Sequence, residues 1–195
     1  CIIGLPIAGF LASTNVTGKK FIIIFFNSMM ALPPVFVGLL LYILFSQTGP
    51  FGFFEILYTP SIMVIAQIII ILPIIVSVST ELMQHIFEEY KEIFDNFEVN
   101  LINRIITTVF DARISLVTCI LTGLGRALSE VGAIIIVGGN IIHYTRVMTT
   151  TIALETSKGN LSMAMSLGIV LIIISISINA IVMIMKTISK KNFYD

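Results

Sequence analysis

Four long apolar runs constrain what this chain can fold into more than any other feature of its sequence. They cover residues 21–46, 58–80, 110–139 and 161–185. Each reaches the roughly 20 residues that an α-helix needs to cross about 30 Å of membrane hydrocarbon. A fifth apolar stretch, residues 1–12, is too short to cross and is interpreted as part of a first helix whose start is missing. The sequence predicts an all-α, polytopic transmembrane helix bundle of about five spans, the first incomplete, in a single domain over residues 1–195.

Composition excludes several classes of function. Apolar residues make up 57% of the chain and charged residues 11%, whereas an ordinary soluble domain is about a quarter charged. A soluble enzyme, a disordered tail and a nucleic-acid binder are therefore excluded, and lipid is an expected partner. We expect no metal site from two cysteines, and no bound cofactor or catalytic residue, because nucleotide-binding and hydrolase motifs are missing.

The distribution of basic residues predicts the orientation. Placing residues 81–109 in the cytoplasm leaves Arg146 and Lys158 outside and Arg126 within a span, while the other basic residues lie inside or at the inner interface. Those inner residues are Lys19, Lys20, Lys91, Arg104, Arg113, Lys186, Lys190 and Lys191. Positive charge concentrates on the cytoplasmic side of membrane proteins, so we expect a cytoplasmic C-terminus.

The predicted cytoplasmic loop, residues 81–109, begins with an amphipathic helix. Apolar residues recur there at spacings of three and four, which is typical of one helix face: Leu82, Met83, Ile86, Phe87, Tyr90, Ile93, Phe94 and Phe97. The other face is acidic, unlike the basic helices that lie on lipid surfaces. Asn100 is a candidate N-cap for a second helix. The first helix either packs only against its own subunit or docks a soluble partner.

A charged pair interrupts the third complete run. Arg126 and Glu130 are four residues apart, so their side chains meet on one helix face, next to a small-residue stripe of Gly125, Ser129 and Ala133. Charges within a span are costly unless they are paired or wet. The pair either adds positive potential to an anion pathway, with Glu130 limiting it, or neutralises itself and fixes helix packing. We expect Gly138, Gly139 and Asn140 to end this helix.

The following segment is rich in hydroxyl groups. Thr145, Arg146, Thr149 and Thr150 lie outside in the predicted orientation. Hydroxyls and a guanidinium can hold a tetrahedral oxyanion through neutral and charge-assisted hydrogen bonds. The candidate substrate path is Arg126, Ser129, Glu130, Asn140, Thr145, Arg146, Thr149 and Thr150.

Several runs of the sequence resemble the membrane permease of tungstate ABC importers. They are Gly-Arg-Ala-Leu-Ser-Glu-Val-Gly-Ala at 125–133, Val-Gly-Gly-Asn-Ile at 137–141, Thr-Arg-Val-Met-Thr-Thr at 145–150 and Glu-Thr-Ser-Lys-Gly-Asn at 155–160. Molybdate and sulfate permeases carry a similar Arg-Ala/Ser-Leu-x-Glu-Phe-Gly-Ala stretch. The resemblance implies a permease of the molybdate-type importer class that moves an oxyanion, most simply tungstate, inward across the inner (cytoplasmic) membrane.

The resemblance also implies partners. They are a second copy of the chain, two ABC ATPase subunits that bind ATP and Mg²⁺, and an extracytoplasmic oxyanion-binding protein. Family permeases contact the ATPase through a cytoplasmic helix with a Glu-Ala-Ala-x3-Gly motif, and residues 89–99 occupy that place. Here Glu98 stands at the glycine position and the paired alanines are missing. The candidate coupling residues are Glu88, Glu89, Tyr90, Glu92, Phe94, Asp95 and Glu98.

Three alternatives remain open at this point. The chain could be a molybdate or sulfate permease of the same class. It could also belong to a different class, as a membrane protein that serves only assembly or as a membrane-embedded enzyme. Co-purification with an ATPase distinguishes an importer subunit from the other two.

Overall fold

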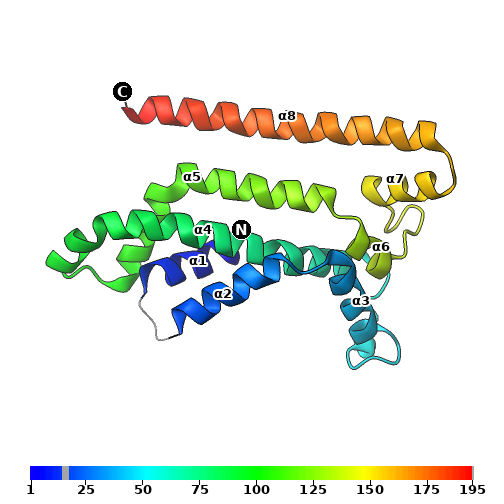
Figure 1. The fold of residues 1–195 in the computed structure, drawn as a ribbon, viewed down its shortest axis with the longest axis horizontal. Coiled ribbons are helices and arrows are strands. Elements are labelled where there is room, and N and C mark those ends of the chain that lie inside the picture. The colour runs from blue at the N-terminus through cyan, green and yellow to red at the C-terminus, as the bar shows by residue number, and fades with distance from the viewer. Residues whose placement is uncertain (15–17, 195) are drawn as a thin grey trace. The chain divides into compact units, whose positions relative to one another are not determined.

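The computed structural model describes residues 1–14 and 18–194, with side chains up to residue 187. Within them the chain is helical and forms no strand, which confirms the all-α prediction (Figure 1). The side chains of Lys190 and Lys191, two predicted cytoplasmic cations, lie outside the described residues. The elements are α1 (Gly4–Ser13), α2 (Lys19–Met30), α3 (Pro34–Phe45), the 3-10 helix η1 (Gly52–Phe54), α4 (Pro60–Asn96), α5 (Leu101–Ser129), α6 (Gly132–Gly138), α7 (Met148–Ser157) and α8 (Leu161–Tyr194).

Three of these helices are long and apolar enough to cross a membrane: α4, α5 and residues 161–187 of α8. The pair α2 and α3 makes a fourth candidate if it is counted as one interrupted span. Helix α4 continues through Pro73 and past the predicted span, so the predicted loop helix is its second half.

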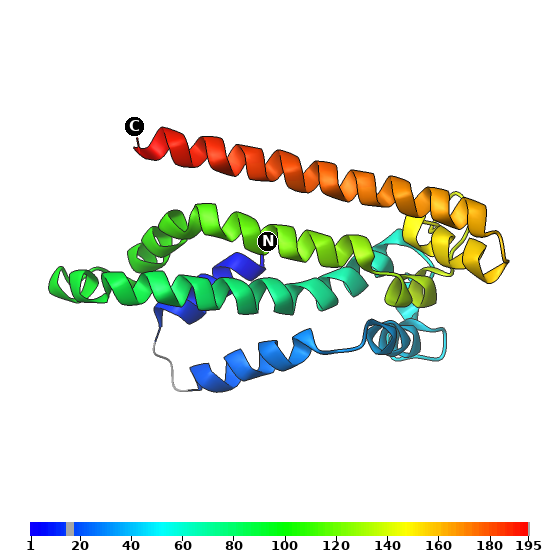
Figure 2. The same cartoon turned by 45° about the horizontal axis from the view of Figure 1, so that its top comes forward.

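The predicted span over residues 21–46 is interrupted at its two prolines. Helix α2 ends at Met30, and α3 begins only at Pro34, after a connection in which Pro33 is extended (Figure 2). Pro33 and Pro34 lack the N–H groups that a continuing helix needs, and each disfavours helical geometry in the residue before it. The two prolines therefore end one helix and start another instead of kinking a single one.

The described residues pack as two compact units, and α4, α5 and α8 contribute to both. The first unit comprises residues 1–31, 72–124 and 181–195. Its core joins α1, α4 and α5 through Ala8, Ala12, Met83, Ala112, Leu116 and Cys119. Alanines on α1 and α5 keep the side chains short, which allows close approach between helices of a membrane protein.

The second unit comprises residues 32–71 and 125–180. Its core joins α3, α4 and α6 through residues that include Val37, Leu41, Ile62, Ala66 and Val137. Helices α3 and α6 approach closely at Gly38, where an added Cβ would lie 2.7 Å from the Cα of Ala133. This contact fixes α6 beside α3 and therefore positions the residues that precede α6.

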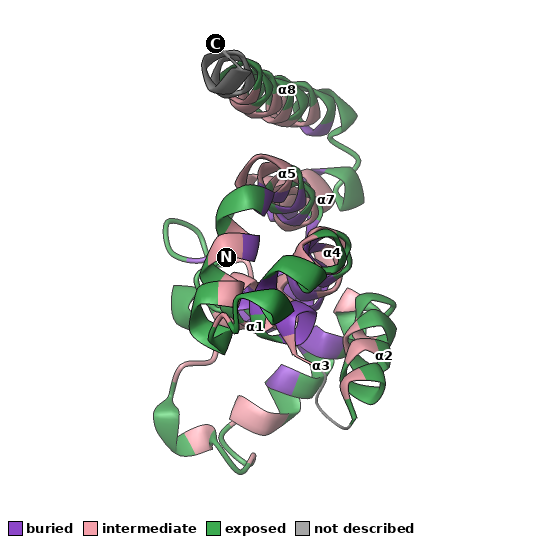
Figure 3. Ribbon diagram, turned by 90° about the vertical axis from the view of Figure 1, so that its left-hand side faces the viewer, coloured by how far each residue is buried: buried purple, intermediate pink, exposed green. Residues whose placement is uncertain are grey.

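The part of α8 that belongs to the second unit, residues 161–180, exposes most of its apolar side chains (Figure 3). Among these residues only Ala164 is buried. An apolar helix surface of this kind is stable only against lipid or another protein chain.

Replacing Gly38 by alanine should destabilise the second unit. The new methyl group meets backbone at Ala133, which cannot move aside like a flexible side chain, and overpacking costs about 1–3 kcal/mol. Gly168→Ala in α8 is the matched control, because its Cβ meets nothing within 4 Å. Thermal unfolding of the detergent-solubilised protein should show a lower melting temperature for Gly38→Ala only. Equal melting temperatures would contradict the close packing of α3 and α6.

Candidate functional site

The charged segment lies at a helix break. Helix α5 ends at Ser129 and α6 begins at Gly132, so the prediction of one continuous helix over residues 110–139 is wrong. The side chain of Glu130 explains the restart: its Oε1 accepts a hydrogen bond of 3.1 Å from the backbone N–H of Ala133. A carboxylate that caps the first turn of a helix satisfies an otherwise unpaired donor there. The predicted end at Gly139 is confirmed by its left-handed backbone, with φ of 67°.

Arg126 and Glu130 are together across the end of α5. Their closest side-chain nitrogen and oxygen are 3.7 Å apart. The Glu130 side chain is only 4% exposed, whereas that of Arg126 is 36% exposed. The carboxylate is thus the buried member of the pair, and the guanidinium keeps an accessible side. Such an arrangement can attract an anion while preventing strong net positive potential.

The predicted small-residue stripe divides at the break. Ala133 is fully buried beside Gly38, whereas Ser129 and Gly125 are exposed. The Ser129 hydroxyl donates to the carbonyl of Arg126 at 3.0 Å. A Cβ on Gly125 would meet nothing within 4 Å. This part of α5 is therefore open to a further helix.

Two of the predicted hydroxyl ligands are buried in the fold itself. Thr145 is buried, donates to the carbonyl of Gly138 and accepts the N–H of Ile141. Thr150 is also buried, and its hydroxyl lies 3.0 Å from both Asn140 Oδ1 and the carbonyl of Val147. Both hydroxyls therefore hold the α6–α7 loop together. Their predicted contact with substrate stays a prediction.

Asn140 and Arg146 are joined to each other in the same loop. The guanidinium of Arg146 donates to the side-chain oxygen of Asn140 at 3.3 Å and to its backbone carbonyl at 3.2 Å. Asn140 itself has a left-handed φ of 50°, a conformation that asparagine tolerates better than most residues. These contacts connect the Gly-Gly-Asn run at 138–140 with Arg146, six residues after Asn140.

Thr149 lies differently from its neighbours, because it lines a cavity in the second unit. Its hydroxyl donates to the backbone carbonyl of Glu130 at 3.2 Å, which joins α7 to the helix break. The cavity has a volume of about 330 Å³. Its polar lining residues are Thr149, Gln67 and Tyr144, and Ala127 and Leu128 next to Arg126 form part of its wall. Sequence reasoning did not select Gln67 as a site residue, although a lone amide inside an apolar run was the available signal. No sequence pattern marked Tyr144 as a cavity residue.

The Glu-Thr-Ser-Lys-Gly-Asn run closes the end of α7. Gly159 has a left-handed φ of 78°, and the N–H of Asn160 bonds to the carbonyl of Glu155 at 2.9 Å. The carboxylate of Glu155 accepts hydrogen bonds of 3.0 Å from both Lys158 and Asn160. These bonds lower the pKa of Glu155 below its usual value. The run is a Schellman-type helix ending with a fixed ion pair.

The second half of α4 carries the predicted coupling face, within the first unit. Phe87 and Phe94 are buried and Tyr90 is half-buried, which confirms the apolar stripe around these residues. Ile93 and Phe97 are exposed, so the stripe is wrong at these two positions, around the end of α4. The acidic residues are all exposed: Glu88, Glu89, Glu92, Asp95 and Glu98. The acidic face is therefore solvent-exposed, although Asp95 pairs with Arg104 and Glu89 lies 3.4 Å from His85.

The turn from α4 to α5 is another Schellman-type ending. The N–H of Val99 bonds to the carbonyl of Phe94 at 3.0 Å, and that of Glu98 to the carbonyl of Asp95 at 3.3 Å. Glu98 occupies the left-handed position, with φ of 49°. The predicted N-cap is confirmed, since Asn100 Oδ1 accepts the N–H of Asn103 at 2.9 Å.

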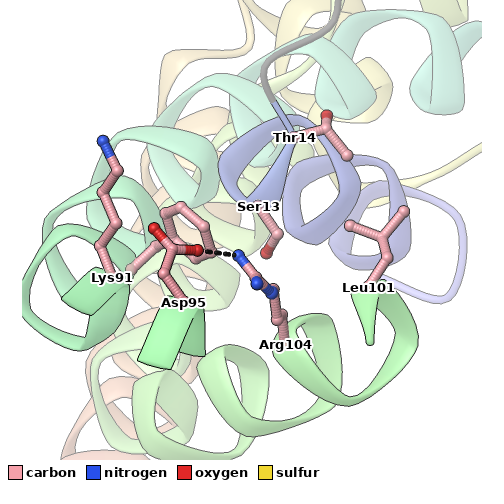
Figure 4. Close-up of a pocket in the computed structure, with 7 residues that line it drawn as sticks. Ser13, Thr14, Lys91, Asp95, Leu101 and Arg104 are labelled. Atoms are coloured by element: carbon pink, nitrogen blue, oxygen red, sulfur yellow. Dashed lines mark hydrogen bonds and ion pairs between the residues drawn. The ribbon is translucent and has the colours of Figure 1, made fainter. Parts of the chain in front are cut away.

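Arg104 holds this turn and was missed as a structural residue. Its guanidinium donates to Asp95 Oδ1 at 2.8 Å (Figure 4). It also donates to the carbonyl of Val99 at 2.7 Å and to that of Phe94 at 3.1 Å. It also borders a cavity of about 410 Å³ that Ser13 and Lys91 help to line. No sequence period connects residues nine positions apart across a turn, so the pair of Arg104 with Asp95 could not be predicted.

Comparison with protein-family models gives no match, but curated relatives are similar to the chain. The probable anion ABC transporter permease protein of Haloferax volcanii is 36% identical over 164 residues, which cover 82% of this chain and 71% of the relative. The tungstate uptake system permease protein TupB of Peptoclostridium acidaminophilum is 37% identical over 180 residues, with coverage of 92% and 79%. TupB of Campylobacter jejuni is 34% identical over 144 residues, with coverage of 74% and 60%.

Substitutions of Glu98 should reveal the left-handed turn. Glycine adopts positive φ without strain, whereas a β-branched residue there is a severe outlier. We expect Glu98→Gly to leave stability within about 1 kcal/mol and Glu98→Val to lower it by more than that. Glu92 supplies the matched control, because glycine is worse than valine inside a helix. We measure the protection of the turn amides from hydrogen exchange. At residue 98 the glycine variant should be more protected than the valine variant, and at residue 92 it should be less protected. The same ranking at both positions would refute the turn geometry.

The charged pair predicts an unequal set of mutant effects. Arg126→Ala leaves a buried carboxylate without its cation, which costs about 3–5 kcal/mol in a fully buried pair and less where one partner is wet. Glu130→Gln removes the charge but keeps an acceptor for the N–H of Ala133. We therefore expect Arg126→Ala to lower the yield of folded protein more than the double variant Arg126→Ala with Glu130→Gln. Equal losses of the folded-protein peak in size-exclusion profiles of the single and the double variant would argue against charge compensation.

Proposed function

Because the chain belongs to the family of ABC transporter permeases, we propose that it is the membrane-spanning subunit of an importer that carries tungstate inward. It is a multi-pass transport subunit. In the proposed complex it lies in the cytoplasmic membrane with its C-terminus inside. Two ATPase subunits bind ATP and Mg²⁺ and drive the cycle, a second copy of the chain completes the pathway, and an extracytoplasmic protein delivers the anion.

Tungstate is proposed as the substrate because two relatives share a name that specifies it. Both are tungstate uptake permeases, and they match 92% and 74% of this chain at 37% and 34% identity. The Haloferax relative is named only for an anion. Molybdate and sulfate are therefore the competitors against which tungstate is tested.

The acidic half of α4 supports docking of an ATPase rather than packing within the subunit alone. Phe87 and Phe94 anchor this half of α4, while Glu88, Glu92 and Asp95 remain exposed on its other side. Exposed carboxylates on an anchored helix can pair with basic side chains of a soluble partner. Residues 81–109 are the proposed coupling loop.

The helix break supports a route for the anion. Tungstate is a dianion and loses part of its hydration when it enters a protein pathway, so donors and positive charge must replace water. Arg126 offers an accessible guanidinium, while Glu130 limits the depth of the binding well. Weak binding is needed for passage, because an anion held tightly does not leave. In the proposed dimer two copies of Arg126 flank the path, and the anion approaches from the α6–α7 loop.

Uptake measurements test the function directly. Cells that express the full transporter, permease with ATPase and binding protein, should accumulate tungsten from submicromolar tungstate, measured by elemental mass spectrometry. A hundredfold excess of sulfate should leave accumulation largely unchanged. Tungsten accumulation that does not depend on the permease would refute the proposal. With isotopically enriched tungstate as the substrate, stronger competition by molybdate or sulfate than by natural-abundance tungstate would reassign the substrate.

The proposed route predicts different effects for two neighbouring threonines and for Arg126. Arg126→Gln should lower tungstate uptake severalfold when uptake is compared at equal amounts of assembled complex with equal basal ATP hydrolysis, because the attraction for the anion is lost. Thr149→Val should also lower uptake, since Thr149 lines the cavity beside the break. Thr151→Val is the control, because the Thr151 hydroxyl donates to the carbonyl of Val147 in its own helix. Normal uptake in both Arg126→Gln and Thr149→Val would place the route elsewhere.

A further inference from the structure

The connection between α3 and α4 presents phenylalanine side chains outward. Phe51, Phe53 and Phe54 are 42%, 73% and 56% exposed. A connection that runs through water is normally polar, and large exposed apolar patches mark contact sites. The segment from residue 21 to residue 54 contains no charged residue, and Glu55 is the first one after it. We therefore expect these rings to contact lipid or protein rather than water.

The connection has a defined fold that holds the rings in place. The N–H of Phe51 bonds to the carbonyl of Leu44 at 2.9 Å, and that of Glu55 to the carbonyl of Gly52 at 3.1 Å. Gly49 and Gly52 lie so close to the end of α3 that an added Cβ would overlap backbone carbonyls there. The chain thus folds back tightly against α3, and the outward rings are a consequence of this backbone.

The rings form one cluster, the phenylalanine cap, which consists of Phe45, Phe51, Phe53 and Phe54. Ring centroids are 5.5 Å apart for Phe45 and Phe51, 6.4 Å for Phe51 and Phe54, and 4.2 Å for Phe53 and Phe54. The cap adjoins the end of α3, whose exposed face is also apolar: Val35, Phe36, Leu39, Leu40 and Ile43. An apolar surface therefore extends from the helix into the connection.

Polar groups lie beside the cap in the same connection. Ser46, Gln47, Thr48 and Glu55 help to line a cavity of about 890 Å³ together with Tyr42 and Tyr58. Apolar rings next to uncharged polar groups suit the boundary between hydrocarbon and lipid headgroups, where aromatic side chains of membrane proteins gather. A soluble protein partner is less suited, because the connection offers a single charge for specificity.

We propose that the phenylalanine cap inserts into the lipid–water interface and anchors the α3–α4 connection to the membrane surface. The inference goes beyond transport and does not depend on which anion is carried. It requires only that the chain is a multi-pass membrane protein. The rings enter the outer part of the hydrocarbon, while Ser46, Gln47, Thr48 and Glu55 remain among headgroups and water.

Tryptophan fluorescence tests the insertion sharply, because the 195 residues contain no tryptophan. Phe53→Trp is introduced into the full permease complex in phosphatidylcholine vesicles, and Phe54→Trp is the second variant. Phe97→Trp is the matched control, since Phe97 is also a highly exposed phenylalanine but lies in the charged turn after α4. All three variants are also measured in permease reconstituted without the ATPase, because in the proposed complex the ATPase docks on residues 81–109. The signal of the unsubstituted complex is subtracted from each.

We expect both cap variants to emit at shorter wavelength than Phe97→Trp and to be quenched at least threefold more by lipid labelled with nitroxide at carbon 5. Nitroxide at carbon 12 should quench less than at carbon 5, as a shallow insertion requires. Quenching by aqueous iodide without lipid quenching would overturn the proposal. So would protection from both quenchers, which would place a protein, such as the second copy or the binding protein, over the cap.

Discussion

The buried carboxylate of Glu130 is the group on which the second unit depends. It pairs with Arg126 at the end of α5, caps the N-terminus of α6 through Ala133, and its backbone carbonyl accepts the hydroxyl of Thr149 from α7. One residue thus connects three helices at the point where the helical hydrogen bonds stop. Because a buried carboxylate is stable only with such partners, the cation and the cap are requirements of the fold before they are features of a pathway.

Much of the fold could be predicted from periodicity and local chemistry. The apolar runs located the long helices, Asn100 and Gly139 marked helix ends, and the apolar stripe identified Phe87 and Phe94 as buried. The break at residues 130–131 was not predicted, although Ser129 and Gly132 beside it are weak helix formers, because weak formers often lie inside helices and the Glu130 side-chain cap is a feature of the folded chain. The apolar run over residues 21–46 did not show that α2 and α3 are separate helices, since two adjacent prolines end a helix that one proline would only bend.

The candidate site shows a different limit. Sequence brought Arg126 and Glu130 together correctly through their spacing, but residue type alone could not separate Thr149 from Thr145 and Thr150. Whether a hydroxyl is available depends on hydrogen bonds to residues as distant as Gly138 and Asn140. The family-like runs around them contain the residues that shape the loop, with left-handed positions at Gly139, Asn140 and Gly159. Resemblance in such runs therefore indicates a similar backbone conformation before it indicates similar contacts with a substrate.

The interruption between α5 and α6 also has an electrical consequence. A broken helix leaves carbonyl and N–H groups that hydrocarbon cannot satisfy, so water or protein must reach them. Where water enters, the insulating layer becomes thinner and the membrane voltage falls over a shorter distance. A divalent anion that enters a cell with a negative interior works against about 4.6 kcal/mol for every 100 mV. In the proposed importer, the partner ATPase must supply that work in addition to the work against the concentration gradient.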